Sequence, residues 1–253
     1  MRRLLFIALF CTSFFVSSEE TISRWMSDYF ERIHGHIGDE NYEKAKYELE
    51  MGNNNYFRGG RTYEAALLYQ LYGQFYAVQS QYTDAVPWFE KALATDKMPR
   101  IGAQEVRFQL AQTYFMIGKY ENVITLLEEF IKIGERYKYP VSARVNLLMS
   151  YSHGRIEQYD SSYYHIKQAN NKSDKPQIDW IEYAFSLAMK LENLDDAEDL
   201  GTRLLFLEPN KKKYWNQVSA LYFAKDFELN SLSCLLYTSP SPRDKRQSRM
   251  PSS

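Results

Sequence analysis

The chain of 253 residues has little cysteine, and its two cysteines lie near opposite ends. Cys11 falls inside an apolar N-terminal run, and Cys234 stands in a Ser- and Pro-containing segment at the other end. The chain between them contains no cysteine, whereas the disulfide framework of a small secreted domain needs several. A disulfide scaffold and thiol chemistry are therefore excluded for the chain between them.

An excess of positive charge is also missing, because 31 Lys and Arg residues face 32 Asp and Glu residues, a formal charge of −1. Without Arg2 and Arg3 of the first segment the charge is −3. The last 20 residues carry a net three positive charges, and without them as well the charge is −6. Nucleic-acid-binding proteins usually carry the opposite sign and a basic patch. We therefore expect no nucleic-acid partner.

No apolar run is long enough for a comfortable membrane span, which needs about 20 residues. The longest run, residues 4–16, follows two arginines and is followed by the small residues Ser17 and Ser18. A charged start, a short apolar core and a small-residue exit are typical of a secretory signal peptide. We expect residues 1–18 to be a cleaved signal, with an uncleaved anchor as the alternative. No stable membrane span is expected after cleavage.

Strand-like alternation is absent over any useful length, and residues 66–99 show a helical spacing instead. Bulky, small and aromatic residues recur there at fixed offsets, and a proline closes the stretch, as in a hairpin of two antiparallel helices. Small residues let the backbones approach where the helices cross, so we expect Gly73 and Ala85 to face each other. The pattern consists of Tyr69, Tyr72, Gly73, Tyr76, Ala85, Phe89, Ala92 and Pro99.

The pattern repeats at steps of 40, 38, 39 and 35 residues, counted between the residues that open each second helix. These openers are Tyr42, Tyr82, Tyr120, Tyr159 and Leu194. Three residues later stand the compact residues Ala45, Ala85, Val123, Ser162 and Ala197, and four further on Leu49, Phe89, Leu127, Ile166 and Gly201. Gly201 is the one weak member of the last set. Among the first helices of the repeats, the one that contains Phe185 matches the repeat pattern worst.

These repeats predict an all-α fold, an α-solenoid of antiparallel helix pairs with five hairpins and one unpaired helix. The helical domain is expected to cover residues 19–230, with a loop at residues 52–55 and 59–60. Its repeats are expected near residues 26–59, 66–99, 104–137, 143–171 and 178–210, with a partial repeat at 212–227.

The last segment, residues 234–253, departs from the helical pattern. It resembles the in-frame translation of a sequencing adaptor, which residues 234–244 and 248–253 match in order. We interpret it as a disordered artefact, with a natural disordered tail as the alternative. On this interpretation the natural sequence differs beyond about residue 233.

Residues 26–227 resemble the tetratricopeptide repeat family. More narrowly, residues 81–94, 105–131 and 207–226 resemble exported repeat proteins of Gram-negative bacteria that are associated with TonB-type energy-transduction systems. The resemblance implies a periplasmic scaffold that binds another protein, with no catalytic residues and no cofactor. It does not indicate an oligomeric state.

The resemblance also implies that the first helices line a concave face that binds a protein or peptide. Glutamines there could hydrogen-bond a peptide backbone, and rings could accept apolar side chains. Phe108 and Phe115 could equally pack between repeats. The candidate groove residues are Leu67, Gln70, Gln74, Phe108, Gln112, Phe115, Arg144, Leu147 and Tyr151.

No constellation predicts catalysis or a metal site, so we do not expect an enzyme. His34 and His36 stand near Asp39 and Glu40, but a metal site needs several converging ligands. Packing explains His36 and His153 better, because both fall at the aromatic position of a first helix. The alternative function is a cell-envelope module that binds peptidoglycan or carbohydrate, which would need several exposed rings in a row.

Overall fold

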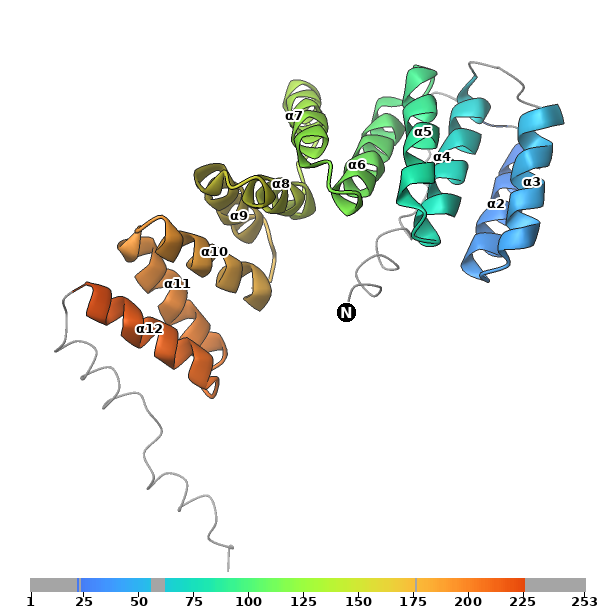
Figure 1. Ribbon diagram of the computed structural model, residues 1–253. Coiled ribbons are helices and arrows are strands. Elements are labelled where there is room, and N and C mark those ends of the chain that lie inside the picture. Colours follow the sequence, from blue (N-terminus) through green and yellow to red (C-terminus); the bar gives the residue numbers. More distant parts are fainter. Residues whose placement is uncertain (1–21, 23, 56–61, 176, 226–253) are drawn as a thin grey trace, which may run out of the picture. The chain divides into compact units, whose positions relative to one another are not determined.

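The computed structural model describes residue 22 and residues 24–55, 62–175 and 177–225 (Figure 1). All regular secondary structure in these ranges is α-helical, which confirms the predicted fold class. The predicted signal peptide and adaptor-like segment lie outside the described residues. The helices are α2 (Arg24–Gly38), α3 (Tyr42–Asn55), α4 (Tyr63–Val78), α5 (Tyr82–Ala94), α6 (Arg100–Met116), α7 (Tyr120–Tyr137), α8 (Ala143–Arg155), α9 (Tyr159–Asn171), α10 (Ile178–Lys190), α11 (Leu194–Leu207) and α12 (Lys212–Ala224).

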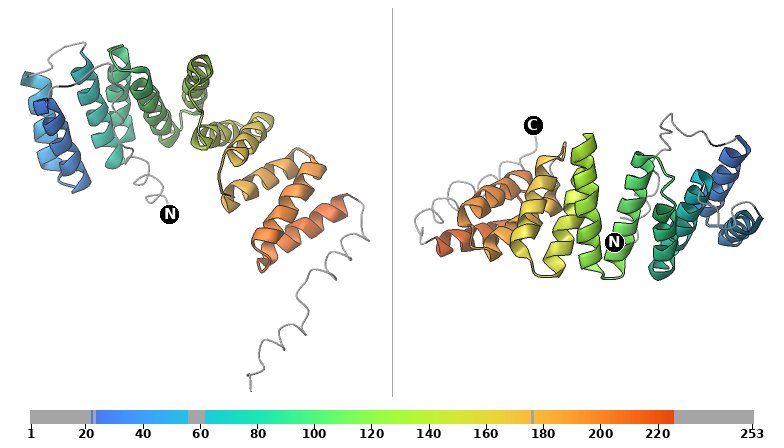
Figure 2. Two further views of the ribbon diagram at one scale, coloured as in Figure 1. Left: turned by 180° about the vertical axis from the view of Figure 1, so that it is seen from behind. Right: turned by 90° about the horizontal axis from the view of Figure 1, so that it is seen from above.

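Two compact units divide the chain, residues 1–156 and residues 157–253, and each is described by itself. In the first unit α2 packs on α3, α4 on α5 and α6 on α7, and each pair contacts the next (Figures 1 and 2). Its last helix, α8, packs on α7. In the second unit α10 pairs with α11, while α9 packs on α10 and α12 on α11. The predicted pairing of α8 with α9 would join the two units and stays a prediction.

The second helix of each predicted pair begins at the residue that the sequence spacing indicates. Helices α3, α5, α7, α9 and α11 start at the five openers. Two residues before each opener the backbone has a positive φ, between 56° and 79°, although only Gly118 is a glycine there. The N–H of Gln81 donates to the carbonyl of Tyr76 at 2.9 Å, and equivalent bonds close three further turns. This is the Schellman arrangement, and it recurs because every pair must reverse direction over the same short distance.

Residues 52–55 were predicted as a loop, and this was wrong, because they form the last turn of α3. Gly52 is buried, and a Cβ on it would lie 2.5 Å from the Tyr29 hydroxyl and 3.3 Å from Leu68 Cδ1. The missing side chain therefore lets α3 lie close to its neighbours. Here packing overrides the loop propensity of Gly and Asn.

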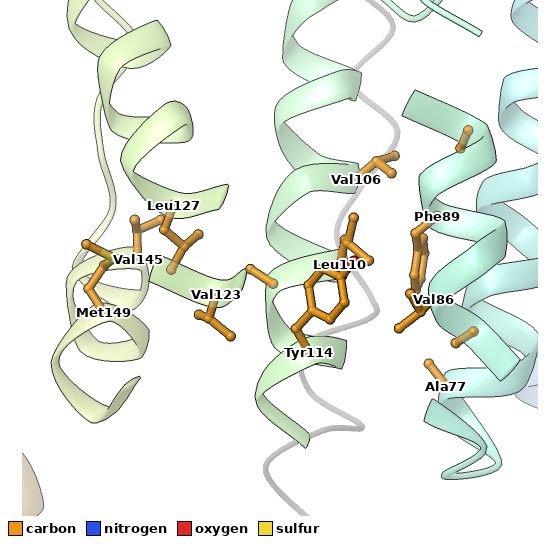
Figure 3. Close-up of a cluster of buried hydrophobic side chains, with 13 residues drawn as sticks. Ala77, Val86, Phe89, Val106, Leu110, Tyr114, Val123, Leu127, Val145 and Met149 are labelled. Carbon is orange, nitrogen blue, oxygen red and sulfur yellow. The ribbon is translucent and has the colours of Figure 1, made fainter. Parts of the chain in front are cut away.

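Gly73 lies at the contact between α4 and α5, as predicted, but its neighbour is the ring of Phe89. A Cβ on Gly73 would lie 2.6 Å from Phe89 Cδ1 and Cε1. Phe89 is fully buried and points with Val86 toward the α6 residues Leu110 and Tyr114 (Figure 3). The small residue on α4 therefore makes room for a large one on α5.

The second unit has the same large and small pair with the two helices exchanged. Phe185 on α10 occupies the repeat position of Gly73, and Gly201 on α11 occupies that of Phe89. A Cβ on Gly201 would lie 2.7 Å from Val218 Cγ2 and 3.1 Å from Phe185 Cε2. The two weakest matches in the sequence pattern therefore compensate each other.

Tyrosine hydroxyls also connect neighbouring helices through buried or half-buried hydrogen bonds. The Tyr114 hydroxyl on α6 donates to Glu90 Oε1 on α5 at 2.5 Å. Burial, and then the hydrogen bond to Glu90 and its negative charge, raise the pKa of Tyr114 to about 12. Similarly, burial and Glu182 raise the pKa of Tyr214 to about 12 in the second unit.

Replacing Tyr114 with Phe should lower the free energy of unfolding near pH 8 by about 1.5–3 kcal/mol, because a hydrogen bond to a charged group is lost. The folded-state pKa of Tyr114 lies above the unfolded value of about 10. Its contribution is therefore complete below pH 10 and is lost as pH rises toward 12. Urea unfolding followed by far-UV circular dichroism should show a shallower alkaline decline for Tyr114→Phe than for the wild type.

Tyr47→Phe is the matched control, because the side chain of Tyr47 is exposed and no hydrogen bond holds its hydroxyl in the described structure. It should leave both the stability at pH 8 and the alkaline decline unchanged. Identical alkaline declines for the wild type and Tyr114→Phe would contradict the proposed role of the Tyr114–Glu90 bond.

Candidate functional site

The predicted groove residues lie on α4, α6 and α8, the first helices of successive repeats in the first unit. Helix α6 contacts α8 directly, and side-chain hydrogen bonds connect α4 to α6. These residues differ in how far they are exposed. Leu67, Gln74 and Gln112 are buried, Gln70, Phe108, Phe115, Leu147 and Tyr151 are half-buried, and Arg144 is exposed.

Gln109 on α6 is the centre of a buried amide cluster. Its Oε1 accepts a hydrogen bond from Gln70 Nε2 at 3.2 Å and another from Gln74 Nε2 at 3.4 Å. Its own Nε2 donates to Glu105 Oε1 at 3.4 Å. The structure therefore brings together two of the predicted glutamines, and it joins them through a residue that the sequence analysis missed.

A polar stripe on α6 could have revealed Gln109. Glu105, Gln109 and Gln112 are spaced by four and three residues, which places them on one helix face. The tetratricopeptide pattern drew attention to the neighbouring Phe108 instead. The position of Gln109 against α4 follows only from the packing of successive pairs.

The two predicted groove rings pack within their own helix pair. The Phe108 ring lies 6.4 Å from that of Phe130, and the Phe115 ring lies 5.4 Å from that of Tyr120, measured between centroids. Both partners belong to α7. These contacts lie within one repeat and not between repeats, and both rings stay half-buried, so their assignment to the groove stays a prediction.

Within the described ranges, no three His, Cys, Asp or Glu side chains are close enough to hold a metal ion. His36 is half-buried on α2 and His153 is buried on α8. In those same ranges, no helix combines the length and the apolar character that a membrane span needs.

Repeated antiparallel helix pairs, with a small residue where the paired helices touch, define the tetratricopeptide-repeat fold, and the described chain has this fold. Solved structures agree. Residues 41 to the end of MamA from Desulfovibrio magneticus RS-1 are 16% identical, cover 76% of this chain and 99% of that chain, and give a TM-score of 0.58. The pilF protein of Pseudomonas aeruginosa is 14% identical over 89% of this chain and 97% of that chain, with a TM-score of 0.57.

A third similar structure is YrrB, described as a tetratricopeptide repeat protein with an unusual peptide-binding site. It is 12% identical, covers 73% of this chain and 91% of that chain, and gives a TM-score of 0.55. No protein-family model matches the sequence, and no curated protein matches it significantly. At these identities the likeness concerns the fold alone.

Proposed function

We propose that the chain is a protein-interaction scaffold, and that the first helices of its first unit bind an extended segment of another protein. The observation that carries this proposal is the amide cluster of Gln70, Gln74 and Gln109 on α4 and α6. An amide side chain offers both a donor and an acceptor, as does each peptide unit of an extended segment. Half-buried Gln70 is the cluster member best placed to reach such a segment.

The neighbouring first helix supplies the other contacts that a peptide needs. On α8, Arg144 is exposed, and Leu147 and Tyr151 are half-buried on the same face, three and seven residues further on. A charge, an aliphatic surface and a ring would contact successive side chains of the bound segment. The YrrB structure, with its peptide-binding site, supports this use of the fold.

The proposed place of action is the periplasm, where the scaffold would be an accessory of a TonB-type transport system. The N-terminal signal pattern supports export, and the resemblance of residues 81–94 and 105–131 to TonB-associated repeat proteins supports the accessory role. Cell fractionation of an epitope-tagged full-length chain tests the location, and a cytoplasmic protein would overturn it.

Photo-crosslinking tests the binding surface. Benzoylphenylalanine placed at Gln70 or Arg144 should give one discrete adduct with a polypeptide in an envelope extract of the source cells. Adding Gln70→Ala to the Arg144 crosslinker should weaken the adduct about two- to tenfold, because a net hydrogen bond is worth about 0.5–1.5 kcal/mol.

Tyr47 is the matched control position, since it is exposed and lies on α3, the second helix of its pair. The crosslinker there should give no such adduct. An equally strong adduct from Tyr47, or none from Gln70 and Arg144, would contradict the proposed surface.

The alternative of a carbohydrate-binding module has weaker support from the exposed rings. Among the described residues each exposed ring lies on a different helix, so no helix presents two stacking platforms to a sugar chain. These rings are Trp25, Tyr47, Tyr137, Tyr164, Phe206 and Phe223.

A further inference from the structure

Two arginines from different helices each lie close to one tyrosine ring, where α6 begins and α7 ends. Arg100 Cζ lies 4.2 Å from the centroid of the Tyr137 ring, and Arg136 Cζ lies 5.6 Å from the same centroid. Because both distances are measured to one point, the two guanidinium groups lie within about 10 Å of each other. The ring of Tyr139 lies 6.3 Å from that of Tyr137 and extends the aromatic surface.

Neither arginine has a carboxylate partner in the described part of the chain, where the ion pairs of the first unit involve other residues. Arg100 and Arg136 are both exposed. Two like charges held near one ring by cation–π contacts repel each other, and anionic groups of a ligand would relieve that repulsion. A guanidinium binds a carboxylate in two parallel hydrogen bonds, which makes such a pair selective for carboxylates or phosphates.

Most of the charged residues close to this site in the sequence are also basic. Three exposed lysines lie within four residues of Arg100 or Arg136 in the sequence. One of them, Lys132, precedes Arg136 by four residues and therefore shares a face of α7 with it. Asp96 and Glu135 are the two nearby carboxylates along the chain. Together with them, the two arginines and the three lysines still carry a net positive charge. The lysines are Lys97, Lys132 and Lys138.

The start of α6 adds to the same field. Arg100 is its first residue, Pro99 provides no side-chain cap, and the first turn contains no acidic residue. The partial positive charge at the helix N-terminus is therefore not offset by a carboxylate from the chain itself. At the end of α7 the negative end of the dipole is already matched by Arg136 and Lys138.

Two exposed apolar residues directly follow the two arginines in the sequence. Ile101 and Tyr137 expose 50% and 37% of their surfaces. Arg100, Ile101, Arg136, Tyr137 and Tyr139 are called the basic edge below. It combines two guanidinium groups with aliphatic and aromatic contact area, a composition that favours a protein ligand.

We propose that the basic edge binds a short acidic segment of a partner protein. Two carboxylates of the segment pair with Arg100 and Arg136, and an apolar side chain between them lies on Ile101 and Tyr137. This surface is distinct from the amide cluster, because Arg100 precedes Gln109 by nine residues, about 14 Å along α6. The inference rests on the proposed scaffold function and adds a second contact to it.

An anionic membrane or a nucleic acid fits the basic edge less well. Both present extended arrays of negative charge, and residues 19–233 carry a formal charge of −6, so the rest of the chain repels them. A short acidic segment meets only the local field, which the Debye length of about 8 Å at physiological salt confines to the edge.

Fluorescence anisotropy tests the inference with the full-length chain and a labelled 12-residue peptide of Glu, Asp and Leu. The acidic peptide should bind, and its Gln, Asn and Leu counterpart should bind at least tenfold more weakly. Arg100→Glu/Arg136→Glu should weaken binding of the acidic peptide at least tenfold, and Arg100→Gln/Arg136→Gln should weaken it less. Binding should also fall as salt is raised from 50 to 300 mM.

Lys44→Glu/Lys46→Glu is the matched control, because it makes the same charge change at exposed positions on α3. It should change the affinity less than twofold, and circular dichroism should show all variants folded. Equal weakening by both charge reversals, or no binding of the acidic peptide, overturns the inference.

Parallel measurements with phosphatidylglycerol vesicles and a single-stranded oligonucleotide should show no binding that depends on Arg100 and Arg136. Such binding in place of peptide binding would also overturn the inference. The outcome is separable from that of the scaffold proposal. Crosslinking at Gln70 reports on the first-helix surface, whether or not the basic edge binds its peptide.

Discussion

Replacing Gly73 with alanine should lower the free energy of unfolding of the first unit by about 1–3 kcal/mol, the usual cost of overpacking a core. The new Cβ would lie 2.6 Å from two ring carbons of Phe89. That ring is fully buried and faces Leu110 and Tyr114 on α6, so a shift of the ring would disturb their packing (Figure 3). Urea unfolding followed by far-UV circular dichroism measures the change.

Gly35→Ala is the control for helix propensity. A Cβ on Gly35 would meet nothing within 4 Å, so the substitution should stabilise the chain by up to about 1 kcal/mol. Replacing the ring with the smaller side chain of leucine in Phe89→Leu should reduce the cost of Gly73→Ala, since the three atoms nearest to the new Cβ belong to that ring. Equal stabilities for Gly73→Ala and Gly35→Ala would show that α4 and α5 do not approach as described.

The start of each second helix could be predicted because several constraints act on the same few residues. The opener must follow a tight reversal, and a compact residue must follow three positions later where the helices touch. Tyr82 and Ala85 satisfy both, and so do Leu194 and Ala197 in a repeat whose first helix matches poorly. The pattern constrains local geometry, and local geometry is what periodicity in a sequence reports.

Contacts between helices could not be predicted in the same way, because they depend on which side chains meet after the pairs have stacked. The sequence pattern treats Phe185 and Gly201 as two separate weak matches, but the structure shows one large and small pair with its members exchanged. Likewise residues 52–55 have loop composition, and only the contact of Gly52 with Tyr29 explains why they are helical.

The candidate surfaces show the same limit. Gln70 and Gln74 could be selected by their positions on a first helix, but Gln109, which joins them, could not be identified without the neighbouring pair. Arg100 and Arg136 are 36 residues apart in the sequence and share a tyrosine only because α6 packs against α7. Function in a repeat fold is determined by the residues that the repeat pattern leaves unspecified.

Exchanging the large and small residues of the last complete pair tests this compensation directly. Phe185→Ala should cost about 3–5 kcal/mol, because Phe185 is 2% exposed and its removal leaves a cavity. Gly201→Phe alone should also be strongly destabilising, since even a Cβ there would lie 2.7 Å from Val218. The double variant moves the ring to α11, the arrangement that Gly73 and Phe89 already have, and fills the cavity with it. Urea unfolding should therefore show the double variant to be more stable than the sum of the single costs predicts, by about 0.5–3 kcal/mol. Full recovery is not expected, because Val218 still crowds the new ring.

Gly201→Phe combined with Phe206→Ala is the control, since Phe206 is 84% exposed on the same helix and leaves no space that the ring could fill. Its two costs should add, and additive costs for the Phe185 and Gly201 variants as well would contradict the compensation.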